Sequence, residues 1–277
     1  MVHEVGSSAR PDLPLAVVVG AGGLGMAVAR RLGLDYRLLL ADRDEAHVTA
    51  QAAALRDAGY GATGLRCDVT CPEDIAALAA QAADAGPVLA LANVVGLSPS
   101  LGTFRTIMAV NLIGAAGIAQ AFLPIMAPGG ASVFISSSAA HMSPVPEALW
   151  PLLEQPRGAE MLDRLEAALG EGATPPQAYA LSKAALNRLC QRQAAAWGAR
   201  NCRINSLSPG LIATPQGARE FKHSPGKHKL LGAIPLAREC TMLEIANIVS
   251  FLLSPQASFI SGTDLLADGG MMAALRP

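Results

Sequence analysis

The stretch Ala16-Val-Val-Val-Gly-Ala-Gly-Gly-Leu-Gly25 decides the fold. Its apolar residues 16–19 predict a buried strand, and glycines at 20, 22 and 25 then lead into Met26-Ala-Val-Ala-Arg-Arg-Leu32, which favours a helix. Glycines at this spacing suit the tight strand-to-helix turn of a βαβ unit. The sequence therefore predicts the first strand and helix of an α/β protein with a parallel sheet.

Short runs rich in Val, Ile and Leu go on alternating with Ala-rich stretches of helical length, as expected for successive βαβ units. The expected strands are Leu15–Val19, Arg37–Ala41, Gly64–Cys67, Val88–Asn93, Ser132–Ser136, Arg203–Leu207 and Leu265–Ala267. The expected helices lie near 24–33, 44–58, 72–84, 104–127, 177–198 and 241–253. No linker divides them, so we expect one domain over 14–277 behind a loose tail at 1–13.

Composition excludes several classes of function. The chain has 277 residues, 51% of them hydrophobic, with a net charge of −1 and a pI of about 6.5, so no overall field attracts nucleic acid or an anionic membrane. It shows no signal peptide and no run approaching the ~20 apolar residues of a membrane span. The five scattered cysteines favour packing thiols over disulfides or a metal site. We expect a cytoplasmic protein without metal.

The glycine turn also predicts a ligand. Without side chains at Gly20, Gly22 and Gly25, a pyrophosphate can approach backbone N–H groups and the positive end of the helix dipole. Asp42, at the end of the second strand, can accept hydrogen bonds from both adenosine ribose hydroxyls and would repel a 2′-phosphate, which favours NAD over NADP. The neighbouring Arg43 could instead pair with a 2′-phosphate, which would favour NADP. For the glycine turn itself, the alternative is a tight strand-to-helix turn that binds no ligand.

Tyr179 and Lys183 form a helix-spaced pair in Gln177-Ala-Tyr-Ala-Leu-Ser-Lys183. A tyrosine with an unperturbed pKa of ~10 needs help to exchange protons near neutral pH. An ammonium one helical turn away favours the phenolate. The pair predicts a proton-transfer site, and an amphipathic surface pair is its alternative.

With both features on one α/β chain, the sequence resembles the short-chain dehydrogenase/reductase family from about Leu13 to its end. Further matches follow in order: Asp68 in Cys67-Asp-Val69, Asn93-Val-Val-Gly96, Asn111 in Val110-Asn-Leu112, Ser137 after Val133-Phe-Ile-Ser136, Asn205-Ser-Leu-Ser-Pro-Gly-Leu-Ile-Ala-Thr214 and Asp268-Gly-Gly270. The resemblance implies a Rossmann-like, doubly wound sheet of about seven strands in the order 3-2-1-4-5-6-7. It also implies a homodimer or homotetramer.

By resemblance, Ser137, Tyr179, Lys183 and Asn111 form the catalytic set. Tyr179 exchanges the proton on the substrate oxygen, Ser137 donates a hydrogen bond to that oxygen, Lys183 holds the nicotinamide ribose, and Asn111 helps to hold a water. Ser136 or Ser138 is the alternative catalytic serine, and Asn111 could simply satisfy buried backbone. The implied cofactor contacts are Gly20, Gly22, Gly23, Leu24, Gly25, Asp42, Arg43, Asp68, Val69, Asn93, Val94, Gly96, Tyr179, Lys183, Pro209, Gly210, Ile212 and Thr214.

The sequence departs from the family's pattern in several places. The glycine turn is one residue shorter than usual with Val19 in place of a threonine, and Ala140 replaces a glycine. Ser137 and Tyr179 stand 42 residues apart, far more than the family needs. Six prolines and the apolar stripe Leu162, Leu165, Leu169 predict that 143–178 is a partly helical insertion that caps the substrate cleft.

Two segments and two side chains are candidates for substrate contact. Residues 143–178 carry six acids against two arginines, and residues 216–238 carry five basic residues against one acid. They could be two solvated surfaces or meet as a two-part lid, or the basic loop could attract an acidic substrate. Ser138 and His141 are further candidates. We expect His141 to face the same cleft as Ser137, and we favour a hydrogen-bonded structural role for it over substrate orientation. His223 and His228 lack a metal-site constellation.

We therefore expect hydride transfer between NAD(H) and a secondary alcohol or its ketone. An NADPH-preferring carbonyl reductase is the alternative that Arg43 favours. A dinucleotide-binding sensor or scaffold without catalysis is the alternative from another class of protein.

Overall fold

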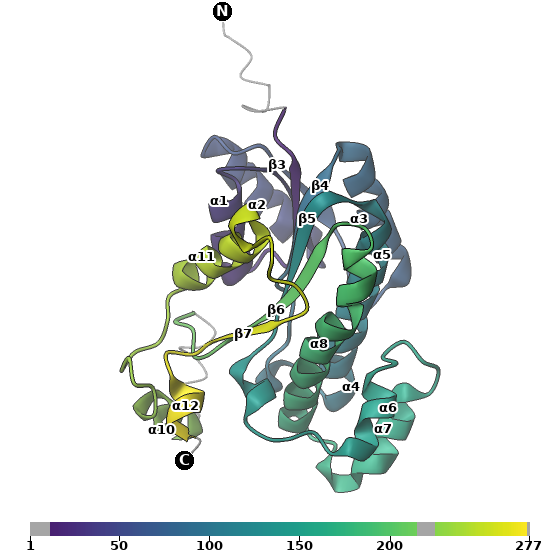
Figure 1. The fold of residues 1–277 in the computed structure, drawn as a ribbon, viewed down its shortest axis with the longest axis vertical. Coiled ribbons are helices and arrows are strands. Elements are labelled where there is room, and N and C mark those ends of the chain that lie inside the picture. Colours follow the sequence, from purple (N-terminus) through teal and green to yellow (C-terminus); the bar gives the residue numbers. More distant parts are fainter. Residues whose placement is uncertain (1–11, 215–224, 276–277) are drawn as a thin grey trace, which may run out of the picture.

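The structure is a computed structural model that describes residues 12–214 and 225–275 (Figure 1). The expected tail up to residue 11 and the part of the basic loop from 216 to 224 lie outside the described residues.

The core is a seven-stranded parallel sheet in the order β3-β2-β1-β4-β5-β6-β7, which confirms the expected topology. The strands are β1 (Leu15–Val19), β2 (Arg37–Asp42), β3 (Ala62–Arg66), β4 (Val88–Asn93), β5 (Met126–Ile135), β6 (Arg203–Pro209) and β7 (Asp264–Ala267). All seven predicted strands exist. β5 begins six residues earlier than predicted, because register shifts beside β4 carry its pairing back to Met126.

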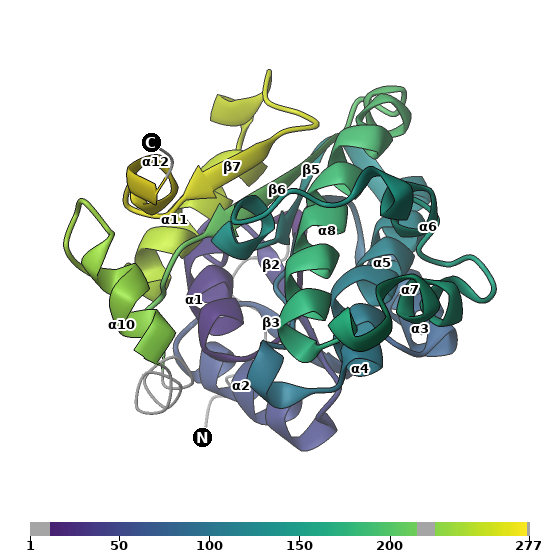
Figure 2. The same cartoon turned by 90° about the horizontal axis from the view of Figure 1, so that it is seen from below.

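Helices cover both faces of the sheet (Figures 1 and 2). They are α1 (Gly23–Leu32), α2 (Glu45–Asp57), α3 (Pro72–Ala85), α4 (Phe104–Met108), α5 (Ala115–Phe122), α6 (Trp150–Leu153), α7 (Met161–Leu169), α8 (Pro175–Gly198), α10 (Pro225–Gly232), α11 (Met242–Leu253) and α12 (Met271–Leu275). The two short helices α10 and α12 were not predicted, because neither has an apolar stripe long enough to be recognised.

Strand β1 shows why the sheet is buried on both sides. Leu15, Val17 and Val19 pack with α3, α5 and α8 on one face. Ala16 and Val18 pack with α1, α2 and α11 on the other face. An uninterrupted apolar run is the sequence signature of such a strand. The glycine turn therefore lies at the carboxyl edge of the sheet, between two helical layers.

The helix predicted over 104–127 is interrupted. It consists of α4, a π-helical segment at Ala109–Gly114, α5 and a 3-10 turn at Leu123–Ile125. Taken together, Phe104–Ile125 is long and apolar enough to cross a membrane by length and composition alone, and 61% of its apolar window is buried in the protein. The expectation that no run approaches this length was wrong. The apolar residues serve the core, where Ile118 and Phe122 are fully buried.

The insertion between Ser137 and Tyr179 leaves the sheet and packs beside it. Its helices α6 and α7 lie against one end of α8 (Figure 1). Leu153 and Leu165 are buried there against Phe104 and Leu181, in a cluster separate from the two faces of the sheet. The predicted leucine stripe is therefore buried, and its partners are α4 and α8.

Candidate active site

Tyr179 and Lys183 lie in the first turns of α8. Thr174 caps this helix by accepting a hydrogen bond from the Gln177 N–H, and two prolines occupy its start, where a missing N–H costs little. The i, i+4 spacing places both side chains on one face, with the Lys183 Nζ 5.9 Å from the centre of the Tyr179 ring. The predicted pair therefore exists and lines one cleft.

Lys183 is buried, with 3% of its surface exposed. Its Nζ donates a hydrogen bond to the backbone oxygen of Ile135 at 2.8 Å. Burial disfavours the ammonium and lowers the pKa of Lys183 to about 8. The backbone of Gly96 lies close to the lysine side chain: a Cβ at position 96 would lie 3.1 Å from the Lys183 Nζ. Lys183 is thus held in place by its surroundings, and it loses its positive charge as the pH rises through about 8.

Three consecutive serines follow β5 and line the cleft. The Ser136 hydroxyl donates to the backbone oxygen of Lys183 at 3.1 Å, which ties the strand end to α8. The Ser137 Oγ accepts from the Ala139 N–H at 3.2 Å and caps a 3-10 turn over Ser138–His141. Ser138 is buried. Because Ser136 is engaged with α8, Ser137 and Ser138 are the better candidates for substrate contact.

Asn111 lies in the π-helical segment and is 1% exposed. Its Oδ1 accepts from the Leu97 N–H at 2.7 Å, and its Nδ2 donates to the Leu97 carbonyl at 3.0 Å. Asn111 therefore satisfies buried backbone groups, as our alternative for this residue stated. Its role in holding a water stays a prediction. Single π turns are frequent at functional sites, and this one lies close to the cleft, since a Cβ on the cleft residue Gly96 would lie 3.5 Å from the Asn111 Oδ1.

The glycine turn forms a close cradle. Gly20 has a φ of +100°, and a Cβ on Gly25 would lie 1.7 Å from the Gly20 oxygen, so neither position accepts a side chain. A Cβ on Gly22 would meet nothing within 4 Å, which leaves open space at the start of α1. Asp42 holds the turn from β2, with its Oδ2 accepting from the Ala21 N–H at 2.9 Å.

A groove of about 390 Å³ runs past this cradle and adjoins a cleft of about 380 Å³ that contains the catalytic candidates. The two share Val94, Gly96 and Leu97. Of the predicted residues, the groove is lined by Gly20, Gly22, Gly25, Asp42, Arg43, Asp68, Val69, Val94 and Gly96. The cleft is lined by Ser137, Ser138, Tyr179, Lys183, Pro209, Gly210, Ile212 and Thr214, again with Val94 and Gly96.

Three predicted cofactor residues lie beside the groove without lining it. Gly23 packs toward α11, since a Cβ there would lie 3.0 Å from the Met242 sulfur, and Leu24 contacts the core cluster on the same face. Asn93 ends β4 and is 3% exposed, and its Oδ1 has no hydrogen-bond partner among the described residues. An orphaned buried acceptor, an open helix start and a carboxylate that lines the groove fit a bound dinucleotide.

Asp68 follows β3 at the far end of this groove. Its Oδ1 accepts hydrogen bonds from the Thr70 hydroxyl and N–H at 2.7 and 2.9 Å, and these bonds lower the pKa of the carboxyl group. Asp68 is therefore an ionised carboxylate that shapes the loop end.

His141 does not line the cleft, contrary to our expectation. Its Nε2 lies 2.8 Å from the Asp264 Oδ2 on β7 and 3.3 Å from the Ser208 hydroxyl. The 3-10 turn rotates the side chain away from Ser137. His141 thus has the structural role that we favoured, and it anchors the serine turn to the sheet.

The insertion and the described part of the basic segment lie far apart. α7 and α10 are on opposite sides of the molecule in both views (Figures 1 and 2). Three of the insertion's six acids pair with the protein's own arginines: Glu154 with Arg188 and Arg192, and Asp163 and Glu166 with Arg105. None of the cleft's lining residues comes from 143–178, because its apolar face is buried on α4 and α8. From the described part of the basic segment, Leu230 lines the cleft.

Sequence reasoning missed several lining residues. Leu97, Ser98 and Pro99 follow the Asn93-Val-Val-Gly96 segment, and their closeness to a matched motif was the available signal. Met142, Leu211, Leu230 and Glu239 also line the cleft. Glu239 lies in no recognised motif, so nothing in the sequence pointed to it.

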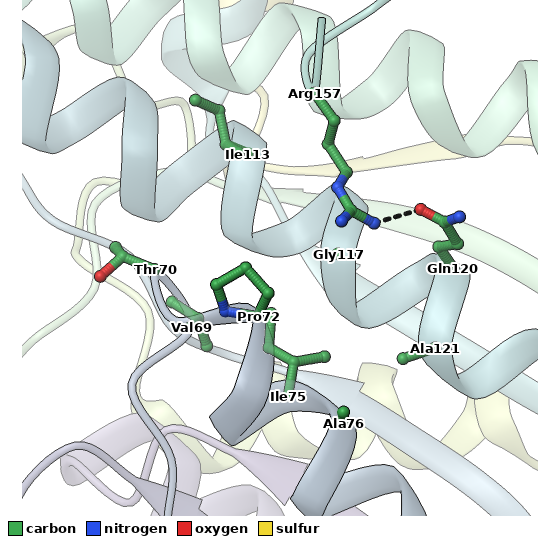
Figure 3. Close-up of a pocket in the computed structure, with 10 residues that line it drawn as sticks. All are labelled: Val69, Thr70, Pro72, Ile75, Ala76, Ile113, Gly117, Gln120, Ala121 and Arg157. Carbon is green, nitrogen blue, oxygen red and sulfur yellow. Dashed lines mark hydrogen bonds between the residues drawn. The ribbon is translucent and has the colours of Figure 1, made fainter. Parts of the chain in front are cut away.

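A separate hollow of about 370 Å³ lies between α3 and α5 (Figure 3). Arg157 from the insertion reaches across it and hydrogen-bonds to Gln120. Its other lining residues are Val69, Thr70, Pro72, Ile75, Ala76, Ile113, Gly117 and Ala121. It holds none of the predicted catalytic residues and meets the cofactor groove only at Val69 and Thr70.

Within the described ranges, no three His, Cys, Asp or Glu side chains gather as a metal site. The five cysteines are free. Burial raises the pKa of the Cys67 thiol to about 12 and that of Cys240 to about 11, so both stay protonated at neutral pH. Four of the thiols pack in hydrophobic clusters, and the fifth, Cys71, donates a hydrogen bond to the Glu73 carboxylate at 3.1 Å.

Comparisons with known proteins agree with this fold. A family model described as short chain dehydrogenase matches residues 14–149, and one described as Enoyl-(Acyl carrier protein) reductase matches 164–272. A protein of Alternaria brassicicola named short-chain dehydrogenase/reductase bsc3 is 32% identical over 266 residues, covering 94% of this chain and 96% of that protein.

Two further relatives carry informative names. A 3-alpha-hydroxysteroid dehydrogenase/carbonyl reductase of Comamonas testosteroni is 34% identical over 188 residues, covering 66% of this chain and 72% of that protein. The structure of a 7 alpha-hydroxysteroid dehydrogenase complexed with NADH and 7-oxo glycochenodeoxycholic acid superposes with a TM-score of 0.75 at 26% identity, covering 95% and 96% of the two chains.

The fold and these similarities define an oxidoreductase that binds a nicotinamide dinucleotide and acts on a small molecule. The chain belongs to the short-chain dehydrogenase/reductase family.

Proposed function

We propose that this protein transfers a hydride between NAD(H) and a secondary alcohol or its ketone, with Ser137, Tyr179 and Lys183 as the catalytic set. The observation that carries the proposal is the single cleft that these three side chains line together with Pro209, Ile212 and Thr214.

The groove would hold the cofactor's adenosine end and the cleft its nicotinamide end. Asp42 would accept hydrogen bonds from the ribose hydroxyls, the cradle at Gly20, Gly22 and Gly25 would hold the pyrophosphate, and Lys183 would hold the second ribose. When bound, the cofactor accepts or supplies the hydride.

The chain's own residues then manage the proton. Tyr179 takes the hydroxyl proton of an alcohol in oxidation and returns one to the oxygen in reduction. Ser137 donates a hydrogen bond to the same oxygen as charge develops on it. Lys183, 5.9 Å from the Tyr179 ring centre, adds a positive charge that favours the phenolate.

An NADPH-dependent carbonyl reductase is the second candidate, and one observation favours it. Arg43 lines the same groove as Asp42. A guanidinium could pair with a 2′-phosphate, whereas the Asp42 carboxylate repels it. We infer that Asp42 dominates because it is fixed to the glycine turn by its bond to the Ala21 N–H.

A screen of secondary alcohols, hydroxysteroids among them, for alcohol-dependent NADH formation tests the proposal and separates it from a non-catalytic dinucleotide sensor. Tyr179→Phe keeps the ring and loses the proton donor. On any substrate found, its turnover should fall at least ~100-fold while NAD affinity changes little. Tyr179→Phe that keeps most of the activity would exclude the proton-transfer role.

A further inference from the structure

The charges that line the catalytic cleft are few. Among its described lining residues, only Lys183 and Glu239 carry a formal charge at neutral pH. They come from opposite layers of the molecule, because α8 packs on one face of the sheet and α11, which follows Glu239, packs on the other. A cation and an anion thus face one small volume from two sides.

Glu239 lies beside the segment 209–214, which lines the cleft proposed to hold the nicotinamide end of the cofactor. Its neighbour Cys240 donates from its N–H to the Leu211 oxygen at 2.9 Å and accepts from the Ala213 N–H at 2.8 Å. These two bonds fix the backbone of residues 239–240 along Leu211–Ala213, and Ile212 and Cys240 form a parallel bridge. The position of Glu239 at the cleft wall is therefore set by backbone hydrogen bonds.

The carboxylate of Glu239 is not neutralised by the arginine next to it. Arg238 directs its guanidinium at Glu244, with two bonds of 2.9 and 2.7 Å. Its contact with Glu239 is to the backbone oxygen alone, at 3.1 Å. The Glu239 Oε1 is buried and has no hydrogen-bond partner within the part of the chain that the structure describes. A buried, unpaired carboxylate oxygen is costly unless something positive or hydrogen-bonding joins it.

The oxidised nicotinamide ring carries a positive charge that the reduced ring lacks. The Lys183 ammonium in the same cleft opposes that charge, and the Glu239 carboxylate favours it. Opposite charges interact strongly across a partly desolvated cleft, and only an interaction that differs between two ligands can discriminate them.

Building on the proposed function, we propose that Glu239 is an electrostatic determinant of cofactor redox state, which strengthens the binding of NAD⁺ relative to NADH. Glu239 acts through its charge and takes no proton in the reaction.

Calorimetric titration of the full chain with NAD⁺ and with NADH, without substrate, tests this inference. Glu239→Gln keeps the side chain's shape and removes the charge. It should weaken NAD⁺ binding about tenfold, equivalent to about 1.4 kcal/mol, and change NADH binding less than about twofold. Glu239→Asp, which keeps the charge, should retain most of the preference. Asp84→Asn on the exposed surface of α3 is the matched control and should change neither affinity.

Other outcomes overturn the inference. If Glu239→Gln weakened the binding of NAD⁺ and NADH equally, Glu239 would contact the cofactor by a hydrogen bond whose strength does not depend on the charge of the ring. Unchanged cofactor binding with an altered substrate KM would mean a substrate contact. A large fall in Tm would mean that Glu239 pairs within the protein. Wild-type protein that binds neither cofactor would refute the proposed function itself, whereas wild-type binding of both with no differential effect of Glu239→Gln would refute this inference alone.

Discussion

Lys183→Met should make the cofactor-free protein more stable while it disables the site. The substitution keeps the length of an apolar stem in a position that is 3% exposed, and it removes a charge that burial opposes. Lys183 has its pKa lowered from 10.5 to about 8. At 1.36 kcal/mol for each pKa unit, the ammonium destabilises the folded state by roughly 3 kcal/mol near neutral pH.

Part of that gain is lost. The Nζ bond to the Ile135 oxygen disappears, which costs about 1 kcal/mol. We therefore expect Lys183→Met to raise the free energy of unfolding by about 2 kcal/mol at pH 7, read from urea denaturation with an unchanged slope.

The dependence on pH follows from the direction of the shift. Below pH 8 the folded and unfolded chains both carry the ammonium, so the folded state bears the whole penalty. Between about 8 and 10.5 the folded lysine loses its proton first, and the penalty declines as pH rises. At pH 9.5 it should be about half its value at pH 7. Subtracting the free energy of unfolding of the wild type from that of the variant removes the contribution of the other groups that titrate in this pH range.

A variant that is less stable than wild type at pH 7, with a difference that does not change at pH 9.5, would refute the reasoning. That result would mean that the folded protein stabilises the ammonium. Lys183→Met should also lose turnover and bind NAD more weakly, so stability and function should move in opposite directions.

Two further substitutions test the groove and the insertion. Wild type should bind NAD at least about tenfold more tightly than NADP, a difference of roughly 1.4 kcal/mol in calorimetric titration. Asp42→Asn should reduce this difference, because it removes the repulsion of a 2′-phosphate yet keeps an acceptor for the Ala21 N–H. Equal affinities of the wild type for NAD and NADP would contradict the assignment of Asp42. Leu165→Ala should lower the free energy of unfolding by about 2–5 kcal/mol, because Leu165 is fully buried against α4 and α8, whereas the partly buried Leu162→Ala should cost less. Equal and small effects of the two would mean that the insertion adds nothing to the core.

The sheet could be predicted from sequence because each strand is specified locally. Residues 15–19 are apolar without interruption, and helices bury them on both faces. The glycine turn was equally predictable, since its requirement is the absence of a side chain, as the 1.7 Å approach at Gly25 shows. Such features depend on a few neighbouring residues.

Side-chain directions at the site were less predictable. His141 follows Ser137 by four residues, yet the 3-10 turn directs it to Asp264 on β7, more than a hundred residues away in the sequence. Glu239 enters the cleft because Cys240 pairs with the segment after β6. Neither contact has a local signal, because both depend on which distant elements the fold brings together.

The insertion shows why the unusual spacing of the catalytic residues leaves their geometry intact. Ser137 is fixed by the end of β5 and Tyr179 by the start of α8, and the Ser136 hydroxyl joins these elements through the Lys183 oxygen. The chain between them is free to lengthen, since the entropy of closing a loop grows only with the logarithm of its length. What a longer connection needs is burial for its apolar side chains, and Leu153 and Leu165 find it on α4 and α8. The number of residues between Ser137 and Tyr179 therefore does not constrain the site. Its geometry is set by the end of β5 and the start of α8.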